Sequence, residues 1–150
     1  MAADIVTQLG QVGPLIVGSV GICVALVNQR RQLNAQMFIE FSKRFQEMLR
    51  LFPTQAWLAN RNPSQHLPPT SPEITDCSLY CIQFIYDIFH LHKARYISRK
   101  LWVLCELEIR RTLTGPVFRR EWPEVAAEFA HNREFVCYVD ALMNGKRPNP

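Results

Sequence analysis

The sequence predicts an all-α protein, in which an N-terminal transmembrane helix continues into a cytosolic helical bundle of about four helices. Three observations indicate this class. Asp4 is the only charged residue before Arg30, although the chain of 150 residues carries 17 basic and 13 acidic side chains. After Arg30, apolar residues recur every three or four positions, which is the period of an amphipathic helix. Nowhere does the strict alternation of a β-strand persist between turn signals.

Residues 1–29 are expected to form the transmembrane segment. The stretch from Ile5 to Val27 has no charged side chain, and crossing the hydrocarbon core of a bilayer takes about 20 apolar residues. Its Gly and Pro residues are tolerated in membrane helices. Three other interpretations remain open: a cleaved signal peptide, which would need a basic N-terminal region, a buried helix of a soluble protein, and two short strands broken at Gly13-Pro14.

The flanks of this segment predict its orientation. Arg30 and Arg31 follow the apolar run directly, whereas no Lys or Arg precedes it. Positive residues accumulate on the cytoplasmic side of membrane helices, so the N-terminus is expected outside and residues 30–150 in the cytoplasm. The same two arginines are candidates for contact with lipid headgroups. Five cysteines, an odd number without a CxxC pair, fit free thiols in a reducing compartment.

The first helix is expected to run from about Asp4 to Leu51, where Pro53 ends it. A proline-rich loop follows at 53–72, with a short helix at Thr54 to Ala59 inside it. The helical period places a set of large side chains in the core of the cytosolic domain: Phe41, Phe45, Met48 and Trp102.

The later helices have recognisable ends. The second is expected to start at a capping box formed by Thr70 and Glu73 and to run to about Lys93. The third is capped by Ser98 and stops at Gly115-Pro116. After a short turn over 117–122, a fourth helix is expected from Pro123 to Gly145. Its apolar residues are Val125, Phe129, Val136, Val139 and Met143.

One constellation has the spacing of a di-metal site in a helical bundle. Asp87 and His90 lie three residues apart on one helix, and Glu128 and His131 lie three apart on another. The remaining carboxylates would come from Glu40, Glu47 or Glu106. Both carboxylate–histidine pairs occupy the polar strips of their helices, so we expect them to face water. No metal site and no cofactor is therefore expected.

Other signals for chemistry are weak. Cys77 and Cys81 share a helical face, but two thiols without a neighbouring His make half of a metal site. The doublets Arg110-Arg111 and Arg119-Arg120 are flanked by glutamates, whereas a nucleic-acid groove needs an undiluted basic stripe with aromatic residues. The chain has no Gly-rich phosphate loop and no hydrolase or zincin motif. We expect no catalytic residue and no nucleic-acid partner.

In organisation the chain resembles uncharacterised small bacterial single-span membrane-anchored helical proteins. The resemblance lies in a span that runs directly into NQRRQLNAQMFIEFSKRFQEMLRLFP, followed by a helical tail with LWVLCELEIRRTL and GPVFRREW. It covers most of the chain. It implies a membrane-anchored helical fold and brings no catalytic residues with it.

These features predict a membrane-anchored, non-catalytic binding or regulatory protein. Its expected partners are the lipid bilayer and, through the membrane helix, a second copy or another membrane protein. Two alternatives stay open. In the first, the glycine-rich helix assembles into a membrane-active or pore-forming element, which liposome leakage would reveal. In the second, the bundle is a metal-dependent enzyme, which bound iron, manganese or zinc would reveal.

The membrane helix carries small residues along one face. Gly10, Gly18, Gly21 and Ala25 are spaced so that they line up on a 3.6-residue helix, in a row that Pro14 interrupts. Small residues let two helix backbones approach closely, and such contacts drive helix association in lipid. This face is therefore the expected contact between membrane helices.

We predict that Gly18→Leu/Gly21→Leu weakens self-association of the membrane helix, because the leucines hold the partner backbone away. A membrane two-hybrid assay measures the effect, with membrane insertion of the variant checked in parallel. A signal equal to that of the parent sequence would show that this face is not the contact.

Overall fold

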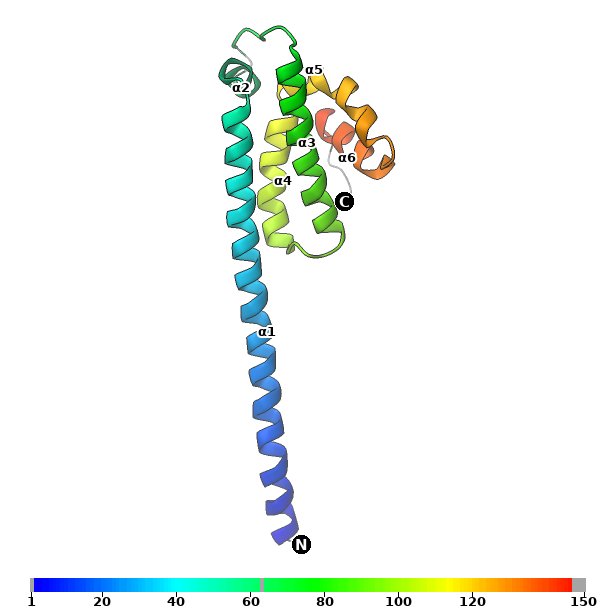
Figure 1. The fold of residues 1–150 in the computed structure, drawn as a ribbon. Coiled ribbons are helices and arrows are strands. Elements are labelled where there is room, and N and C mark those ends of the chain that lie inside the picture. The colour runs from blue at the N-terminus through cyan, green and yellow to red at the C-terminus, as the bar shows by residue number, and fades with distance from the viewer. Residues whose placement is uncertain (1, 63, 147–150) are drawn as a thin grey trace. The chain divides into compact units, whose positions relative to one another are not determined.

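The computed structural model is all-α over the residues that it describes. The backbone is described for residues 2–62 and 64–146, and the side chains from Val24 onward within these ranges. The helices are α1 (Ala2–Leu51), α2 (Thr54–Arg61), α3 (Pro72–Lys93), α4 (Arg99–Leu113), α5 (Pro116–Val125), the 3-10 helix η1 (Ala126–Phe129) and α6 (Arg133–Met143) (Figure 1). These ranges contain no β-strand. The all-α class is thus confirmed.

The chain divides into two compact units, Met1–Ile39 and Glu40–Pro150. In the described part of the first unit, Ala25, Arg30 and Arg31 are exposed. Burial is described only from Val24 onward, so the predicted contact face at Gly10, Gly18 and Gly21 and most of the segment 1–29 lie outside the residues whose surroundings are described. Over the residues with described side chains, no helix has the length and apolar character to cross a bilayer.

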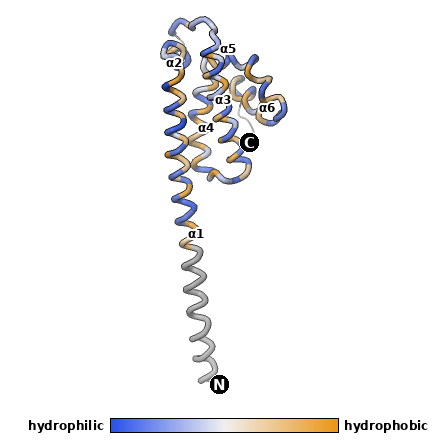
Figure 2. Tube along the Cα trace, in the orientation of Figure 1, coloured by the Kyte–Doolittle hydropathy of each residue, from blue (hydrophilic) through white to orange (hydrophobic). Residues whose placement is uncertain are grey.

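The second unit is the helical bundle. Along its helices, hydrophobic and hydrophilic residues alternate within each turn (Figure 2), and the apolar ones meet in a core rich in aromatic rings. Phe135 of α6 packs against Phe89 of α3 and Phe129 of η1, with ring centroids 5.5 and 5.3 Å apart. All three side chains are fully buried. This aromatic contact joins the middle of the bundle to its C-terminal helix.

The last turns of α1 pack at the edge of the bundle. Phe41 meets the ring of Phe84 edge to face at 5.9 Å, and Phe45 meets Trp57 at 6.3 Å. Trp102 is buried as predicted, but Phe41, Phe45 and Met48 are only half-buried. The rings that Phe41 and Phe45 contact belong to α3 and α2. The prediction that Phe41, Phe45 and Met48 are buried in the core was therefore wrong, because α1 covers the bundle with one side only and leaves these side chains partly exposed.

Helices α1 to α4 have ends close to those that the sequence predicts, but α1 begins at Ala2 and α2 continues to Arg61. The side chain of Ser98 accepts a hydrogen bond from the backbone N–H of Leu101 and caps α4. For α3, however, the cap is Ser71, whose hydroxyl accepts from the backbone N–H of Ile74 at 3.4 Å. The predicted cap, Thr70, lies one residue too early and contacts Glu121 instead.

The predicted fourth helix is three elements. Residues 117–122, expected as a turn, belong to α5, and Pro123 lies inside that helix instead of starting one. The chain then tightens into η1, and Asn132 caps a new helix, α6, by accepting a hydrogen bond from the N–H of Phe135. Gly145 follows the end of α6 at φ +69°, a left-handed conformation that favours glycine.

The apolar side of this region was nevertheless predicted correctly for most residues. Four of the five predicted apolar positions are buried, and the fifth is half-buried: Val125, Phe129, Val139 and Met143 are buried, Val136 is not.

We predict that Phe135→Ala destabilises the bundle far more than Phe45→Ala. Removing a fully buried phenylalanine leaves a cavity and costs about 3–5 kcal/mol, whereas Phe45 already contacts solvent. Thermal and denaturant unfolding of the full chain in detergent, followed by circular dichroism, measures both variants. Equal losses for the two variants would contradict the edge position of α1.

Candidate functional site

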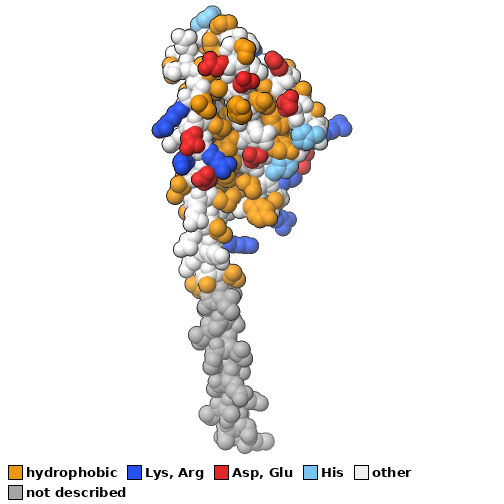
Figure 3. Space-filling model, viewed as in Figure 1, with side chains coloured by type: hydrophobic (Ala, Val, Ile, Leu, Met, Phe, Trp, Pro, Cys, Tyr) orange, Lys and Arg blue, Asp and Glu red, His pale blue; other side chains and the backbone are white. Residues whose placement is uncertain are grey.

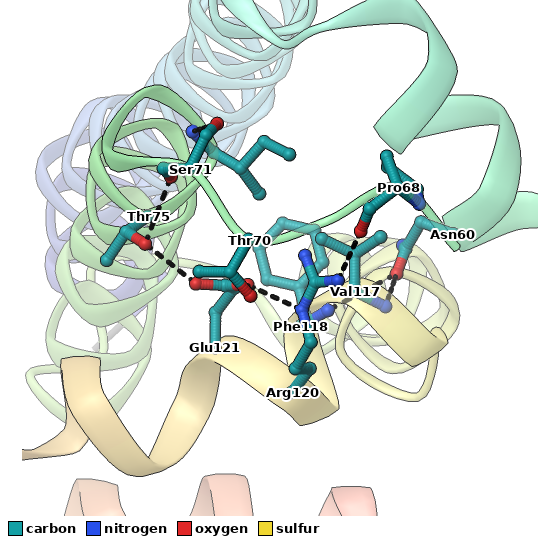
Figure 4. Close-up of polar contacts among 10 residues, drawn as sticks. Asn60, Pro68, Thr70, Ser71, Thr75, Val117, Phe118, Arg120 and Glu121 are labelled. Atoms are coloured by element: carbon teal, nitrogen blue, oxygen red, sulfur yellow. Dashed lines mark hydrogen bonds and ion pairs between the residues drawn. The ribbon is translucent and has the colours of Figure 1, made fainter.

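The most extensively hydrogen-bonded buried polar side chains of the described residues lie at the start of α5. They are Asn60 of α2, which is 3% exposed, and Glu121 of α5, which is 2% exposed. Figure 4 shows their contacts with the loop before α3 and with the first turns of α3 and α5. Burying such groups costs free energy unless they form hydrogen bonds. The hydrogen-bond partners of the two side chains therefore indicate whether this cluster has a structural or a catalytic role.

Asn60 caps α5 from a distant part of the chain. Its Oδ1 accepts hydrogen bonds from the backbone N–H groups of Val117 (3.1 Å) and Phe118 (3.4 Å). These are the second and third residues of α5, the donors that an N-cap side chain normally satisfies. Its Nδ2 donates to the carbonyl oxygen of Thr112 at 3.0 Å. One amide therefore links α2 to the end of α4 and the start of α5.

Gly115 provides the space for this contact. It is the residue at the N-cap of α5 and has no side chain to cap the helix itself. A Cβ atom at this position would lie 2.1 Å from Oδ1 of Asn60, which is well inside van der Waals contact. A glycine here is thus required by the close approach of Asn60.

Glu121 binds the loop before α3. Its Oε2 accepts a hydrogen bond from the hydroxyl of Thr75 at 2.8 Å, and its Oε1 accepts from Thr70 at 3.4 Å. The guanidinium of Arg120 donates to Oε1 at 2.8 Å through Nε and to the carbonyl oxygen of Pro68 through Nη1. Both carboxylate oxygens are occupied by groups of the chain itself.

This arrangement suits a structural role. A catalytic carboxylate needs a free face toward a substrate, whereas every contact of Asn60 and Glu121 shown in Figure 4 is with the chain itself. The cluster joins α2, the loop, α3 and α5. Sequence reasoning missed both residues because the partners that join them to other helices, such as Thr112 and Thr75, lie more than 45 positions away along the chain.

The structure brings His90 and His131, two members of the predicted metal constellation, to the same tyrosine. The ring of Tyr86 lies 4.4 Å from His90 and 5.9 Å from His131. His90 accepts a hydrogen bond at Nε2 from Asn132, and the hydroxyl of Tyr86 lies 3.2 Å from Nε2 of His131. Both histidines are exposed, as are Asp87 and Glu128.

These residues do not form a metal centre. Asp87 accepts a hydrogen bond from Gln83 instead of facing the histidines. In the described part of the chain, no three His, Cys, Asp or Glu side chains come together in a way that could hold a metal ion. Of the residues that the sequence pairs, the two histidines take part in ring contacts with Tyr86.

The cysteines of α3 are packing residues. Cys81 is buried, and burial raises the pKa of its thiol to about 12, although the nearby charge of Arg61 acts in the opposite direction. Cys77 is half-buried, donates through Sγ to the carbonyl oxygen of Leu51, and has its pKa raised by burial and by Glu73 and Asp76. Both thiols are held in the neutral form, which is a poor metal ligand and nucleophile.

The rings of His92 and Tyr138 lie beside Trp102. Its ring stacks on His92 at 4.1 Å, and the ring of Tyr138 lies 6.1 Å away. Burial lowers the pKa of His92, opposed by the charge of Glu106, and burial raises the pKa of Tyr138 above its ordinary range. The described residues offer no hydrogen-bond partner to Trp102 Nε1 or the hydroxyl of Tyr138. Ring contacts therefore join α3, α4 and α6 at this point.

The arginine doublets mix with acidic side chains. Arg110 lies 4.0 Å from Glu106, Arg111 lies 3.8 Å from Glu108, and Arg120 is held by Glu121. Figure 3 shows the same mixture on one face of the bundle, where basic, acidic and hydrophobic side chains are interspersed. Arg119 is exposed. The doublets therefore do not merge into a continuous basic surface of the kind that binds phosphates.

Comparison of the chain with known protein families, with functionally described proteins and with solved structures finds no match.

We predict that Asn60→Ala destabilises the bundle by about 1–3 kcal/mol, because two N–H groups and one carbonyl lose a buried partner. Gly115→Ala destabilises it as well, since its methyl group collides with Asn60. In the double variant that collision is gone, so its loss is close to that of Asn60→Ala alone.

Unfolding of the full chain in detergent measures this double-mutant cycle. Asn144→Ala, at an exposed helix end, is the matched control and is expected to change stability by less than about 0.5 kcal/mol. Additive losses for Asn60→Ala and Gly115→Ala would contradict direct contact between these two positions.

Proposed function

We propose that the protein is a single-span membrane anchor carrying a non-catalytic helical binding domain. The observation that carries the proposal is the sequence from Ile5 to Gln29, which has no charged side chain and is followed at once by Arg30 and Arg31. The N-terminus lies outside, and the bundle lies in the cytoplasm. Arg30 and Arg31 contact anionic lipid headgroups at the boundary.

The close packing of the bundle's interior supports a binding role, in which the domain acts through its surface. Large rings from α3, η1 and α6 pack directly against one another, with Phe89, Phe129 and Phe135 fully buried. The buried carboxylate of Glu121 has partners on both oxygens. A bundle packed in this manner recognises other molecules with its surface, while its interior maintains the fold.

The helix α1 supports the connection between anchor and bundle. It runs from Ala2 to Leu51, so the uncharged segment and the turns that contact Trp57 and Phe84 belong to one helix. No loop separates the uncharged segment from these turns along the chain.

We predict that a reporter active only in the cytoplasm, fused after Pro150, is active. Replacing Arg30 and Arg31 with Gln weakens the orientation bias because the positive charges next to the segment are gone. The matched control is Arg119→Gln/Arg133→Gln, which removes two exposed charges that are distant from the segment along the chain and leaves the orientation unchanged. Activity of a reporter restricted to the outer compartment would overturn the proposal, as would recovery of the full chain in the soluble fraction.

A further inference from the structure

We infer that residues 95–100, the α3–α4 tip, form a contact of the bundle with an anionic membrane surface. The tip comprises the end of the loop between the two helices and the start of α4. It carries three basic residues, Arg95, Arg99 and Lys100, which are exposed and form no ion pair with any described residue. The side chain of Tyr96 beside them is 71% exposed, the largest fraction among the large hydrophobic side chains of the described residues.

The sequence leaves these cations without neutralising neighbours. No acidic residue occurs between Asp87 and Glu106, so neither the loop nor the first turn of α4 offers a carboxylate at helical spacing. Elsewhere in the bundle, several basic side chains pair with glutamates, as Arg110 does with Glu106. Near the tip, Glu134 of α6 contacts Lys93 at 2.6 Å and neutralises that cation instead. The tip therefore keeps a net positive charge.

The backbone of the tip holds an arginine where glycine is usual. The N–H of Arg95 donates to the carbonyl oxygen of His92, and the N–H of Tyr96 donates to that of Leu91, both at 2.9 Å. This is the Schellman motif, in which the residue in the left-handed conformation is usually glycine. Arg95 occupies that position at φ 63°, which costs free energy for a residue with a Cβ atom. A charged residue at a position that lowers stability points to a use of its charge outside the fold.

Helix α3 carries the tip to the end of the bundle at which α1 enters. The first turns of α3 lie beside the end of α1, where Cys77 donates to the carbonyl oxygen of Leu51. Farther along, Phe84 contacts Phe41, so the two helices run antiparallel. The loop after α3 thus lies at the opposite end of the bundle from α2 (Figure 1). Under the proposed function, on which this step rests, only residues 30–39 separate this end of the bundle from the membrane segment along the chain.

The side chains of the tip fit a lipid surface. Each basic residue near an anionic surface strengthens the contact about fivefold. Tyrosine is enriched at the boundary between headgroups and hydrocarbon, because its ring is apolar and its hydroxyl is polar. A nucleic-acid groove would need a longer basic stripe. A layer of headgroups needs only a cluster of charges of one sign beside such a ring.

A fluorescent label next to the tip tests the inference with the full chain reconstituted into vesicles. The label on Ala94→Cys is expected to be quenched by acrylamide at least about threefold less in phosphatidylcholine with about 30% phosphatidylglycerol than in phosphatidylcholine alone. Gln65→Cys, exposed in the loop at the other end of the bundle, is the matched control and is quenched equally in both. The ratio of the two positions cancels differences in vesicle orientation, and the labelled parent chain gives the background from its own thiols.

Removal of charge in the Ala94→Cys background identifies the groups that bind. Arg99→Gln/Lys100→Gln is expected to weaken the contact about 25-fold, since each charge contributes about fivefold. Quenching then returns to its value in neutral vesicles. Arg111→Gln/Arg119→Gln, which removes two exposed charges toward the other end of the bundle, is the matched control and leaves the protection unchanged.

The left-handed position gives an independent test. Arg95→Gly is expected to raise the midpoint of thermal unfolding in detergent, because glycine adopts this conformation without strain. The same change is expected to weaken the lipid contact about fivefold, because a charge is lost. A residue with only a structural role would not give these two opposite effects. A lower midpoint would assign Arg95 to the fold and count against the inference.

Three results would overturn the inference. The first is equal quenching at position 94 in both kinds of vesicle, and the second is protection that survives Arg99→Gln/Lys100→Gln. The third is release of the label by millimolar inorganic phosphate but not by sodium chloride of equal ionic strength, which would assign the tip to a soluble phosphate compound.

Flotation of the same samples tests the anchor separately. Chain that fails to float with neutral vesicles contradicts the proposed function, and its label still reports whether the tip contacts anionic vesicles added to it. Chain that floats with an unprotected label contradicts only the inference about the tip.

Discussion

The hydrogen bonds of the Asn60 side chain are the interaction on which the arrangement of α2, α4 and α5 depends. It supplies a cap that α5 lacks in its own sequence, and it reaches α5 only because Gly115 leaves room for it. The same side chain donates a hydrogen bond to one carbonyl oxygen near the end of α4, that of Thr112. Asn60 thus joins α2, α4 and α5 at one point, and this fixes where α5 carries Glu121. The buried carboxylate of Glu121 is then placed to hold the loop before α3.

The energetics of this region are asymmetric. Each hydrogen bond to Asn60 or Glu121 adds about 1 kcal/mol to stability, but a buried group that loses its partner costs more. A carboxylate that is 2% exposed must keep its hydroxyl and guanidinium partners. The cluster therefore favours one arrangement of the loop over its alternatives. The loop is rich in proline, and Pro68 contributes a backbone acceptor to Arg120.

The rest of the bundle is held together by rings. Phe89, Phe129 and Phe135 connect α3, η1 and α6, and Trp102 stacks on His92 between α3 and α4. Some polar atoms that face this interior, among them Trp102 Nε1 and the hydroxyl of Tyr138, have no hydrogen-bond partner among the described residues. The predicted pairs, Asp87 with His90 and Glu128 with His131, lie outside this interior as exposed side chains, with the two histidines beside Tyr86.

The sequence by itself determined the elements whose signals are local. The unbroken period of α1, the proline that ends it, the serine that caps α4 and the glycine that follows α6 each act within a few residues, so they could be predicted. Only the tertiary structure decided the rest. Thr70 and Ser71 are both good caps, and Glu121 draws Thr70 away. Residues 117–122 lack a local cap and were predicted as a turn, yet they form a helix because Asn60, 57 residues before Val117, supplies one. A side chain that caps at such a distance leaves no periodic signal in the sequence, since its position depends on how α2 packs.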